Sequence, residues 1–369
     1  MKVAPFIHAI QNLNPISKEK VEHLLVHTGQ HYDDRMSRVF FESLNIPEAD
    51  INLGIGSGSH AEQVGHSMIE LEKIFIRENP DWVVIYGDVN ATLAASVTAK
   101  KLHIRVCHIE AGLRSGDMQM PEEINRLVTD RLSDLLLTPD SLSIENLILE
   151  GTSREKIKFV GNIMIDTLEA NREKAGSLNI ASIISENLLP DQPVKKSINH
   201  AGKLAVVTMH RPSNVDEKEI FSNLVHFITD EVARDMLVIW PIHPRAEKRL
   251  REFVLWDKVA ATKNLVLLYP LGYHEMLRLN MEASIMLTDS GGLQEECTVL
   301  GTPCLTLRWN TERPITLKEN GGASVLVGNN IERIREEYQK TLTEDRIPRR
   351  PELWDGKTAE RCVKAILGY

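Results

Sequence analysis

The stretch Trp82-Val83-Val84-Ile85-Tyr86-Gly87-Asp88 sets the fold class of this chain. Its first five residues are β-branched or aromatic, which favours a buried strand. A helical pattern follows at 91–102, and a second apolar run follows at 104–109. A strand, a helix and a strand in this order are typical of a βαβ unit with a parallel sheet.

The same alternation continues on both sides of this unit. In the first half we expect further strands at 23–27, 134–137 and 157–160, a helix at 61–77 and an opening helix from Val3 to Leu13. In the second half we expect strands at 204–208, 237–240, 265–269, 284–287, 304–307 and 323–327. A stretch with Pro190, Pro193 and Gly202 separates the two sets. The pattern predicts an α/β protein with two doubly wound domains facing a cleft.

We place the first domain at 1–167, with 357–369 returning to it as a helix, and the second at 168–356. A length of 369 residues suits two domains. The net charge of −9 argues against a nucleic-acid or anionic-membrane partner. No run approaches the apolar length of a membrane span, and the start lacks a signal-peptide profile, so we expect a cytoplasmic protein.

The cysteines and histidines do not indicate a metal or disulfide site. No two of the four cysteines are spaced as a Cys-x-x-Cys pair, which fits free thiols in a reduced compartment. None of the thirteen histidines belongs to a His-Glu-x-x-His motif. No Walker A loop and no Gly-x-Gly-x-x-Gly fingerprint occurs either. The sequence therefore predicts no metal and no cofactor.

Carboxylates follow two neighbouring predicted strands of the first half. Asp88 comes after the strand at 82–86, and Glu110 comes directly after the strand at 104–109. Open α/β sheets bind ligands at the carboxyl ends of their strands. Either acid alone could cap a helix or bind a loop, but the two together favour a functional site.

Glu122 adds a third carboxylate at this edge. It stands in Pro121-Glu122-Glu123, which is also an ordinary helix start. Crowded carboxylates raise some pKa values and can supply both an acid and a base at neutral pH. The three acids together therefore predict acid–base chemistry.

The second half supplies groups that suit a nucleoside diphosphate. His210 and His243 each follow a predicted strand, and Ser290-Gly291-Gly292 stands between a strand and a helix. Glycines there let backbone N–H groups approach a phosphate at the helix start. Arg313 adds a cation. Glu296, about one turn inside the helix, is placed for ribose hydroxyls, although a solvated helix acid is the alternative reading.

Several motifs occur in order along the whole chain and carry a resemblance. They are Gly29-Gln30-His31, Tyr86-Gly87-Asp88, His108-Ile109-Glu110-Ala111-Gly112-Leu113-Arg114, Pro121-Glu122-Glu123-Ile124-Asn125-Arg126, Gly161-Asn162, His210-Arg211, Leu287-Thr288-Asp289-Ser290-Gly291-Gly292-Leu293-Gln294-Glu295-Glu296 and Thr311-Glu312-Arg313-Pro314. With them the chain resembles the non-hydrolysing UDP-N-acetylglucosamine 2-epimerase family. The resemblance implies two Rossmann-like domains in a glycosyltransferase-B-like architecture, a homodimer, and no metal or redox cofactor.

The resemblance also implies an activity and residue roles. Family members interconvert UDP-GlcNAc and UDP-ManNAc, precursors of surface polysaccharides, by anti-elimination of UDP and re-addition with inversion at C2. By this resemblance Asp88, Glu110 and Glu122 supply the acid and base at C2, and His210 assists the departing diphosphate. The implied substrate-binding residues are Lys2, Arg126, His243, Met276, Ser290, Gly291, Gly292, Glu296 and Arg313. Gln30 and His31, with His243, match positions that bind an activating second UDP-GlcNAc in some bacterial members.

The chain departs from the family pattern in two places. The family opens with a strand and a Gly-Thr-Arg-Pro loop before a lysine-bearing helix. Lys2 matches that lysine, but the strand and the loop are absent. We therefore expect either a natural start upstream of Met1 or an interrupted first sheet. Met276 stands where an aromatic residue near the uracil is common, and methionine can also pack on a base.

Four other functions stay open from the sequence. A hydrolysing relative would release UDP and free ManNAc, and a close relative would act on a UDP-diacetamido-sugar uronic acid. A glycosyltransferase of the same architecture would have no use for three clustered carboxylates. A catalytically silent UDP-sugar-binding protein would follow from the missing amino-terminal segment.

Overall fold

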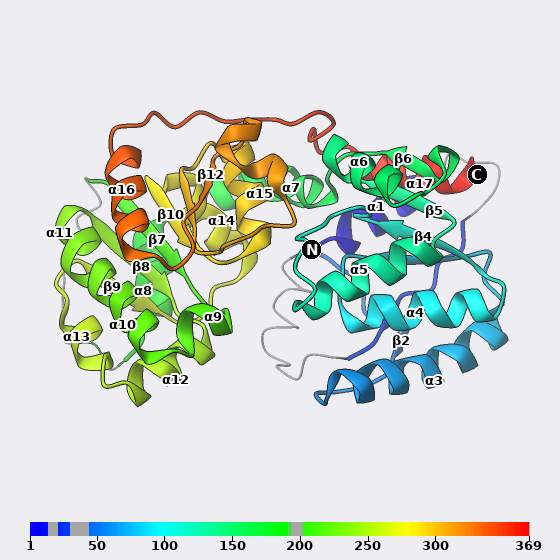
Figure 1. Ribbon diagram of the computed structural model, residues 1–369, viewed down its shortest axis with the longest axis horizontal. Helices are drawn as coiled ribbons and strands as arrows, with labels where there is room; N and C mark the ends of the chain where they lie inside the picture. The colour runs from blue at the N-terminus through cyan, green and yellow to red at the C-terminus, as the bar shows by residue number, and fades with distance from the viewer. Residues whose placement is uncertain (14–20, 30–43, 191, 193–201, 369) are drawn as a thin grey trace. The chain divides into compact units, whose positions relative to one another are not determined.

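The computed structural model describes residues 1–13, 21–29, 44–190, 192 and 202–368, and the chain divides into two compact units (Figure 1). Unit 1 comprises Met1–Ala170 and Pro351–Tyr369, and unit 2 comprises Asn171–Arg350. Every named strand in both units pairs in parallel, which confirms the predicted α/β class. None of the helices in the described part has the length and apolarity needed to cross a bilayer.

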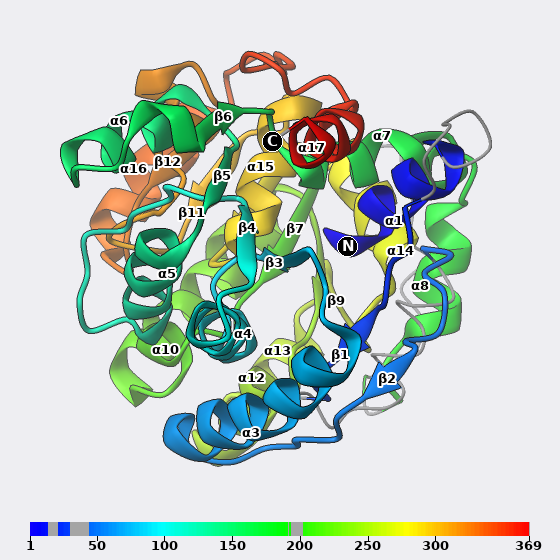
Figure 2. The same ribbon diagram turned by 90° about the vertical axis from the view of Figure 1, so that its right-hand side faces the viewer.

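Unit 1 is built on a four-stranded parallel sheet in the order β3-β4-β5-β6 (Figure 2). These strands are β3 (Trp82–Tyr86), β4 (Arg105–Ile109), β5 (Leu135–Thr138) and β6 (Ile157–Phe159). Its helices are α1 (Val3–Leu13), α3 (His60–Glu78), α4 (Asn90–Lys101), α5 (Pro121–Leu132), α6 (Ser141–Leu149) and α17 (Thr358–Leu367); α7 (Ile163–Gly176) continues into unit 2. The strands and helices predicted at these places are confirmed.

Two further strands of unit 1 form a sheet of their own. In the described part of the chain β1 (Val26–His27) pairs only with β2 (Ile51–Asn52). Val26 and Ile51 nevertheless pack against the apolar cluster that contains Val83 and Ile85 of β3. The strands of unit 1 therefore share one core while lying in two sheets. The strand β2 is absent from the sequence prediction because two residues cannot show an alternating pattern.

The two faces of the four-stranded sheet are covered by different helices. Cys107 and Ile109 of β4 pack with Phe6 of α1 and Cys362 of α17. On the opposite face Val106 of β4 packs with α3 and α4. This alternation along β4 follows from the two-residue period of a strand. It leaves the carboxyl ends of β3 and β4 to carry polar groups.

Asp166 of α7 fastens the last helix to unit 1. Its carboxylate accepts hydrogen bonds from the backbone N–H groups of Thr358, at 3.0 Å, and Ala359, at 2.6 Å, in the first turn of α17. Burial raises the pKa of this carboxyl, although these amides and Arg361 act in the opposite direction. The carboxylate therefore works as a cap supplied from a distant helix.

We expect Asp166→Ala to lower the free energy of unfolding by about 1–2 kcal/mol, because the first amides of α17 lose their acceptor inside the protein. Urea titration followed by circular dichroism measures the change. Glu360→Ala, at an exposed position of the same helix, is the control and should leave the midpoint unchanged. Equal midpoints for the two variants would contradict the capping role.

Unit 2 is a six-stranded parallel sheet in the order β12-β11-β10-β7-β8-β9. The strands are β7 (Leu204–Thr208), β8 (Leu237–Pro241), β9 (Leu265–Leu268), β10 (Ile285–Thr288), β11 (Cys304–Thr306) and β12 (Ser324–Leu326). The chain runs outward from β7 to β9 on one side and from β10 to β12 on the other. The strand order therefore reverses between β7 and β10, which is where doubly wound sheets bind their ligands. The six predicted strands are confirmed.

The helices of unit 2 are α8 (Ile180–Asn187), α9 (Pro212–Val215), α10 (Lys218–Phe227), α11 (Ala233–Asp235), α12 (Pro244–Glu252), α13 (Trp256–Ala261), α14 (Tyr273–Glu282), α15 (Gly291–Leu300) and α16 (Ile331–Thr341). Most of them connect these strands, while α8 precedes β7 and α16 follows β12. Apolar clusters lie on both faces of the sheet, and Trp240 of β8 is fully buried in the larger one. All the residues of these two clusters belong to unit 2.

Candidate functional site

The predicted acids of unit 1 lie at the carboxyl edge of its four-stranded sheet. Asp88 follows β3 through Gly87, Glu110 follows β4 directly, and Glu122 stands in the first turn of α5. A Cβ added to Gly87 would lie 3.4 Å from Oε2 of Glu110 and 2.7 Å from Nζ of Lys2. Gly87, Lys2 and Glu110 are therefore in close contact, and a side chain at position 87 would displace the lysine.

Glu110 combines a strained backbone with a buried ion pair. Its φ is 77°, in the left-handed region that non-glycine residues rarely adopt. Its carboxylate is paired with the ammonium group of Lys2. Strained non-glycine residues concentrate at functional sites, because the surrounding structure must hold them in place. Lys2, predicted to bind substrate, here contacts one of the predicted acids.

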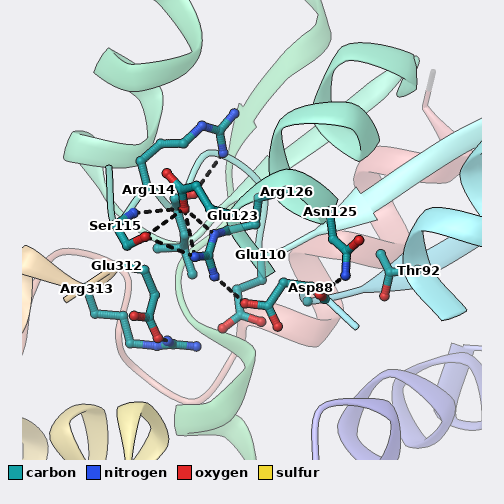
Figure 3. Close-up of polar contacts among 12 residues, drawn as sticks. Asp88, Thr92, Glu110, Arg114, Ser115, Glu123, Asn125, Arg126, Glu312 and Arg313 are labelled. Carbon is teal, nitrogen blue, oxygen red and sulfur yellow. Dashed lines mark hydrogen bonds and ion pairs between the residues drawn. The ribbon is translucent and has the colours of Figure 1, made fainter. Parts of the chain in front are cut away.

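The buried guanidinium of Arg126 binds the carboxylate of Asp88 (Figure 3). It also donates to Glu123 from Nη2, at 2.7 Å, and from Nε, at 2.9 Å. Asn125 donates to the backbone carbonyl of Asp88 at 2.9 Å. The family resemblance implies that Arg126 binds substrate, and in this unit its guanidinium binds one of the predicted acids.

Glu123 is a site residue that sequence reasoning missed. Its carboxylate accepts from the backbone N–H groups of Ser115, at 3.0 Å, and Gly116, at 2.9 Å, besides the arginine (Figure 3). Burial opposes the charge, but the amides and Arg126 outweigh it and lower the pKa of Glu123. By contrast Glu122 is exposed. Glu123 is therefore a buried partner of Arg126, whereas Glu122 is exposed and accessible to a ligand.

The corresponding edge of unit 2 carries a histidine–carboxylate pair at the strand reversal. Asp289, directly after β10, is fully buried. It accepts from the backbone N–H groups of His210 and Arg211, both at 2.9 Å, and from Nδ2 of Asn214 at 3.0 Å. Nδ1 of His210 lies 2.8 Å from its other oxygen. Burial raises the pKa of Asp289, but His210 and the amides more than reverse this and lower it.

The pair leaves Nε2 of His210 as the ring nitrogen available to a ligand, and the side chain is 43% exposed. Asp289 was quoted in a motif but not predicted as a site residue, since only the fold shows that it meets His210. His243 lies next to it, with ring centroids 5.5 Å apart. Burial and the neighbouring His210 lower the pKa of His243. Its Nδ1 accepts from the backbone N–H group of Arg245, so its neutral ring carries the proton on Nε2.

The loop after β10 packs against Arg313. Ser290 precedes the first turn of α15, and Gly291 and Gly292 open that turn. A Cβ on Gly291 would lie 2.8 Å from Nη1 of Arg313 and 2.8 Å from Oε1 of Glu312. Only glycine allows this approach. The helix start and the guanidinium are thus brought together, as the sequence predicts for a diphosphate site.

Arg313 is held by two buried carboxylates. It is ion-paired with Glu312 (Figure 3), and its Nε lies 2.9 Å from Glu295. Glu312 also pairs with Arg308 at 2.6 Å. Burial raises the pKa of Glu312, but Arg313 and Arg308 outweigh it and hold that pKa far below its usual range. Glu295, Glu312 and Arg308 were not predicted as site residues, although Arg308 and Arg313 stand only four residues and one residue from Glu312.

Glu296 follows Glu295 in α15 and is buried. Burial raises the pKa of this carboxyl to about 7, and the side chains of Tyr273 and Asn280 reduce the rise. The alternative reading as a solvated helix acid is wrong, since the residue is buried. Met276 of α14 packs, half-buried, against an apolar cluster of the same unit.

The predicted allosteric residues Gln30 and His31 lie outside the described residues, so the structure does not test that prediction. Among the residues that are described, no group of three histidine, cysteine or acidic side chains could hold a metal ion.

The comparisons with known proteins identify the same family over nearly the whole chain. The family model for UDP-N-acetylglucosamine 2-epimerase matches residues 15–367. The UDP-N-acetylglucosamine 2-epimerase of Methanocaldococcus jannaschii is 41% identical over 371 residues, covering 100% of this chain and 96% of that protein. The crystal structure of the M. jannaschii enzyme with UDP-GlcNAc and UDP matches with a TM-score of 0.87 at 40% identity, covering 100% and 96% of the two chains. A UDP-2,3-diacetamido-2,3-dideoxy-D-glucuronate 2-epimerase of Pseudomonas aeruginosa is 36% identical, covering 89% and 88%.

Proposed function

Because the chain belongs to the UDP-N-acetylglucosamine 2-epimerase family, we propose that it interconverts UDP-GlcNAc and UDP-ManNAc by inverting C2 of the sugar. The observation that carries this proposal is the family match along nearly the whole chain, residues 15–367. The relative with a diacetamido-uronate substrate is less similar than the M. jannaschii epimerase.

The proposed reaction removes and returns one proton. A carboxylate takes the proton from C2, the electron pair of that bond forms the C1–C2 double bond, and the C1–O bond breaks with release of the UDP anion. A carboxylic acid then delivers a proton to the other face of C2 while UDP re-forms its bond to C1. Two opposed acid–base groups are required. Asp88, Glu110 and Glu122 supply them, with Arg126 and Lys2 fixing the first two.

The leaving diphosphate needs donors that are already in position when its charge develops. We assign this role to Nε2 of His210, which Asp289 orients. Ser290, Gly291 and Gly292 offer the helix start, and Arg313 adds a guanidinium in contact with it. Glu296 and Met276 are assigned to the ribose and the uracil, and His243 to the diphosphate.

Incubation with UDP-GlcNAc in heavy water, followed by proton NMR, tests this function. The proposal expects a reversible mixture of UDP-GlcNAc and UDP-ManNAc with deuterium at C2. Accumulating free ManNAc and UDP would establish a hydrolysing enzyme. Turnover of the diacetamido-glucuronate substrate alone would establish that relative's activity, and UDP-sugar binding without any exchange at C2 would establish a silent binding protein.

A pH dependence of UDP binding follows from Glu296. The ionised carboxylate accepts hydrogen bonds from the ribose hydroxyls, and a pKa of about 7 means that it is largely protonated below neutrality. We expect UDP affinity to rise about tenfold between about pH 6 and about pH 8, beyond the rise shown by Glu296→Gln. Titration calorimetry measures the UDP affinity of both proteins at each pH. The ratio of the two affinities removes the effect of UDP ionisation, which is the same for both proteins. Parallel pH profiles would refute the ribose role.

We also propose that the protein is a cytoplasmic homodimer. Its four cysteines are free and buried, which fits a reducing compartment. Large apolar side chains are exposed on α3 and α5, which both pack against α4: Ile69, Ile76, Ile124 and Val128. Exposed apolar residues on neighbouring helices favour an interface with a second copy.

The double variant Ile124→Glu, Val128→Glu is expected to be monomeric, because charges replace apolar contacts in the interface. Light scattering coupled to size exclusion measures the mass. Leu149→Glu, which changes a still more exposed apolar residue of α6, should stay dimeric. A monomeric wild-type protein would contradict the proposed homodimer.

A further inference from the structure

We propose that Asp130 is a positioning residue for the acids of unit 1 and that it acts through a doubly protonated His108. The proposal rests on the epimerase function for its kinetic consequences. Its structural part, the charge on His108, stands without that function. Neither residue was predicted to have a role.

Asp130 joins three segments of unit 1 through one carboxylate. It lies on α5, the helix that carries Glu122 and Arg126, and is fully buried. Oδ1 lies 2.6 Å from Nδ1 of His108 on β4. Oδ2 accepts from the backbone N–H group of Gly112 at 3.0 Å and from Nη1 of Arg114 at 2.7 Å. A buried carboxylate with this many donors is rigidly held.

Both nitrogens of the His108 ring face acceptors. Nδ1 faces the Asp130 carboxylate, and Nε2 lies 2.8 Å from the backbone carbonyl oxygen of Gly87. A carbonyl oxygen cannot donate, and the carboxylate of Asp130 already accepts from a backbone amide and an arginine. Each ring nitrogen must therefore carry a proton, which makes the side chain an imidazolium.

The charges around His108 balance this cation. Burial opposes the ionisation of Asp130, but His108 and Arg114 outweigh it and lower its pKa. Arg114 in turn donates to Glu150 from Nε and Nη2, both at 2.7 Å. Two cations and two carboxylates thus alternate from β4 to the end of α6. Buried charges persist in proteins when they are paired and hydrogen-bonded in this way.

The groups that this network holds are the neighbours of the proposed acids. Gly87, bound by His108, immediately precedes Asp88. His108 and Gly112, both bound by Asp130, stand two residues before and two residues after Glu110, whose φ is positive. One carboxylate on the Glu122-bearing helix therefore fixes the turns that carry Asp88 and Glu110. A misplacement of about 1 Å at reacting groups can lower a rate about a hundredfold.

The first measurement uses the wild-type protein with histidine labelled by nitrogen-15. Nitrogen NMR is expected to show both ring nitrogens of His108 protonated at neutral pH, the signal being assigned by its loss in His108→Gln. A neutral ring, with one unprotonated nitrogen, would overturn the proposal. This readout needs no catalytic activity and no folded Asp130 variant.

The second measurement compares Asp130→Asn with Asp134→Asn. Asp134 also binds a backbone N–H group of β4, that of Val106 at 2.9 Å, and an ion-pair partner, Lys100, but at the opposite end of the strand. We expect Asp130→Asn to lower kcat about a hundredfold with KM little changed, and Asp130→Glu to recover part of it. Asp134→Asn should keep kcat even where it loses stability. An unchanged kcat in Asp130→Asn, or an equal loss in both variants, would contradict positioning, whereas an inactive wild-type protein would contradict the proposed function instead.

Discussion

Asp88→Asn is expected to lower kcat by about two to four orders of magnitude while UDP affinity changes by less than about twofold. The amide cannot take a proton from C2, whereas the nucleotide-binding groups all belong to unit 2. The exchange preserves the size of the side chain, so Arg126 keeps a hydrogen-bond acceptor at this position. Steady-state kinetics with UDP-GlcNAc and calorimetry with UDP measure the two quantities.

Asp81→Asn is the matched control for this prediction. Asp81 is exposed and precedes β3, so it lies at the opposite edge of the sheet from Asp88. Its replacement should leave kcat unchanged. A loss of UDP affinity in Asp88→Asn as large as its loss of kcat would show that the acid serves binding rather than proton transfer.

Arg313→Ala is expected to damage both binding and folding of unit 2. The guanidinium is buried between Glu295 and Glu312, so its removal leaves two buried carboxylates without their shared partner. Breaking a buried ion pair from one side costs about 3–5 kcal/mol. Binding of UDP should weaken as well, because the diphosphate loses a cation while the carboxylates stay. The expected result is a lower midpoint in urea and a UDP affinity reduced by more than tenfold, about 1.4 kcal/mol.

Arg335→Ala provides the comparison. Arg335 pairs with Glu231 at 2.7 Å on the surface, and its side chain is 49% exposed. Exposed pairs contribute about 0–1 kcal/mol, so this variant should resemble the wild-type protein in both measurements. If Arg313→Ala retained wild-type UDP affinity, the diphosphate role of the loop would be wrong, whatever happened to stability.

The strands of this protein were predictable because their signal is local. Runs such as 82–86 and 204–208 are apolar, short and followed by turn residues, and the structure places strands there. The same local signal puts Asp88, Glu110 and His210 at the ends of strands, where an α/β sheet exposes them. Position along a strand is therefore enough to predict which residues reach the edge of the sheet.

The partners of these residues were not predictable. Arg126 was assigned to substrate binding by the family resemblance alone, and its ion pairs with Asp88 and Glu123 were not foreseen. Asp289 reaches His210 across 79 residues of chain, and Asp130 reaches His108 across 22. No periodic pattern links residues so far apart in sequence. A carboxylate that orients another side chain differs from one that meets a ligand only in its three-dimensional surroundings.

The proposed function requires one sugar nucleotide to contact the acids of unit 1 and the proposed diphosphate-binding loop of unit 2 at the same time. A crystal structure of Asp88→Asn grown with UDP-GlcNAc measures this directly. The account predicts the diphosphate on Ser290–Gly292 and Arg313, with C2 of the sugar in contact with position 88, Glu110 or Glu122. A sugar bound to unit 2 with its C2 out of reach of all three positions would contradict it.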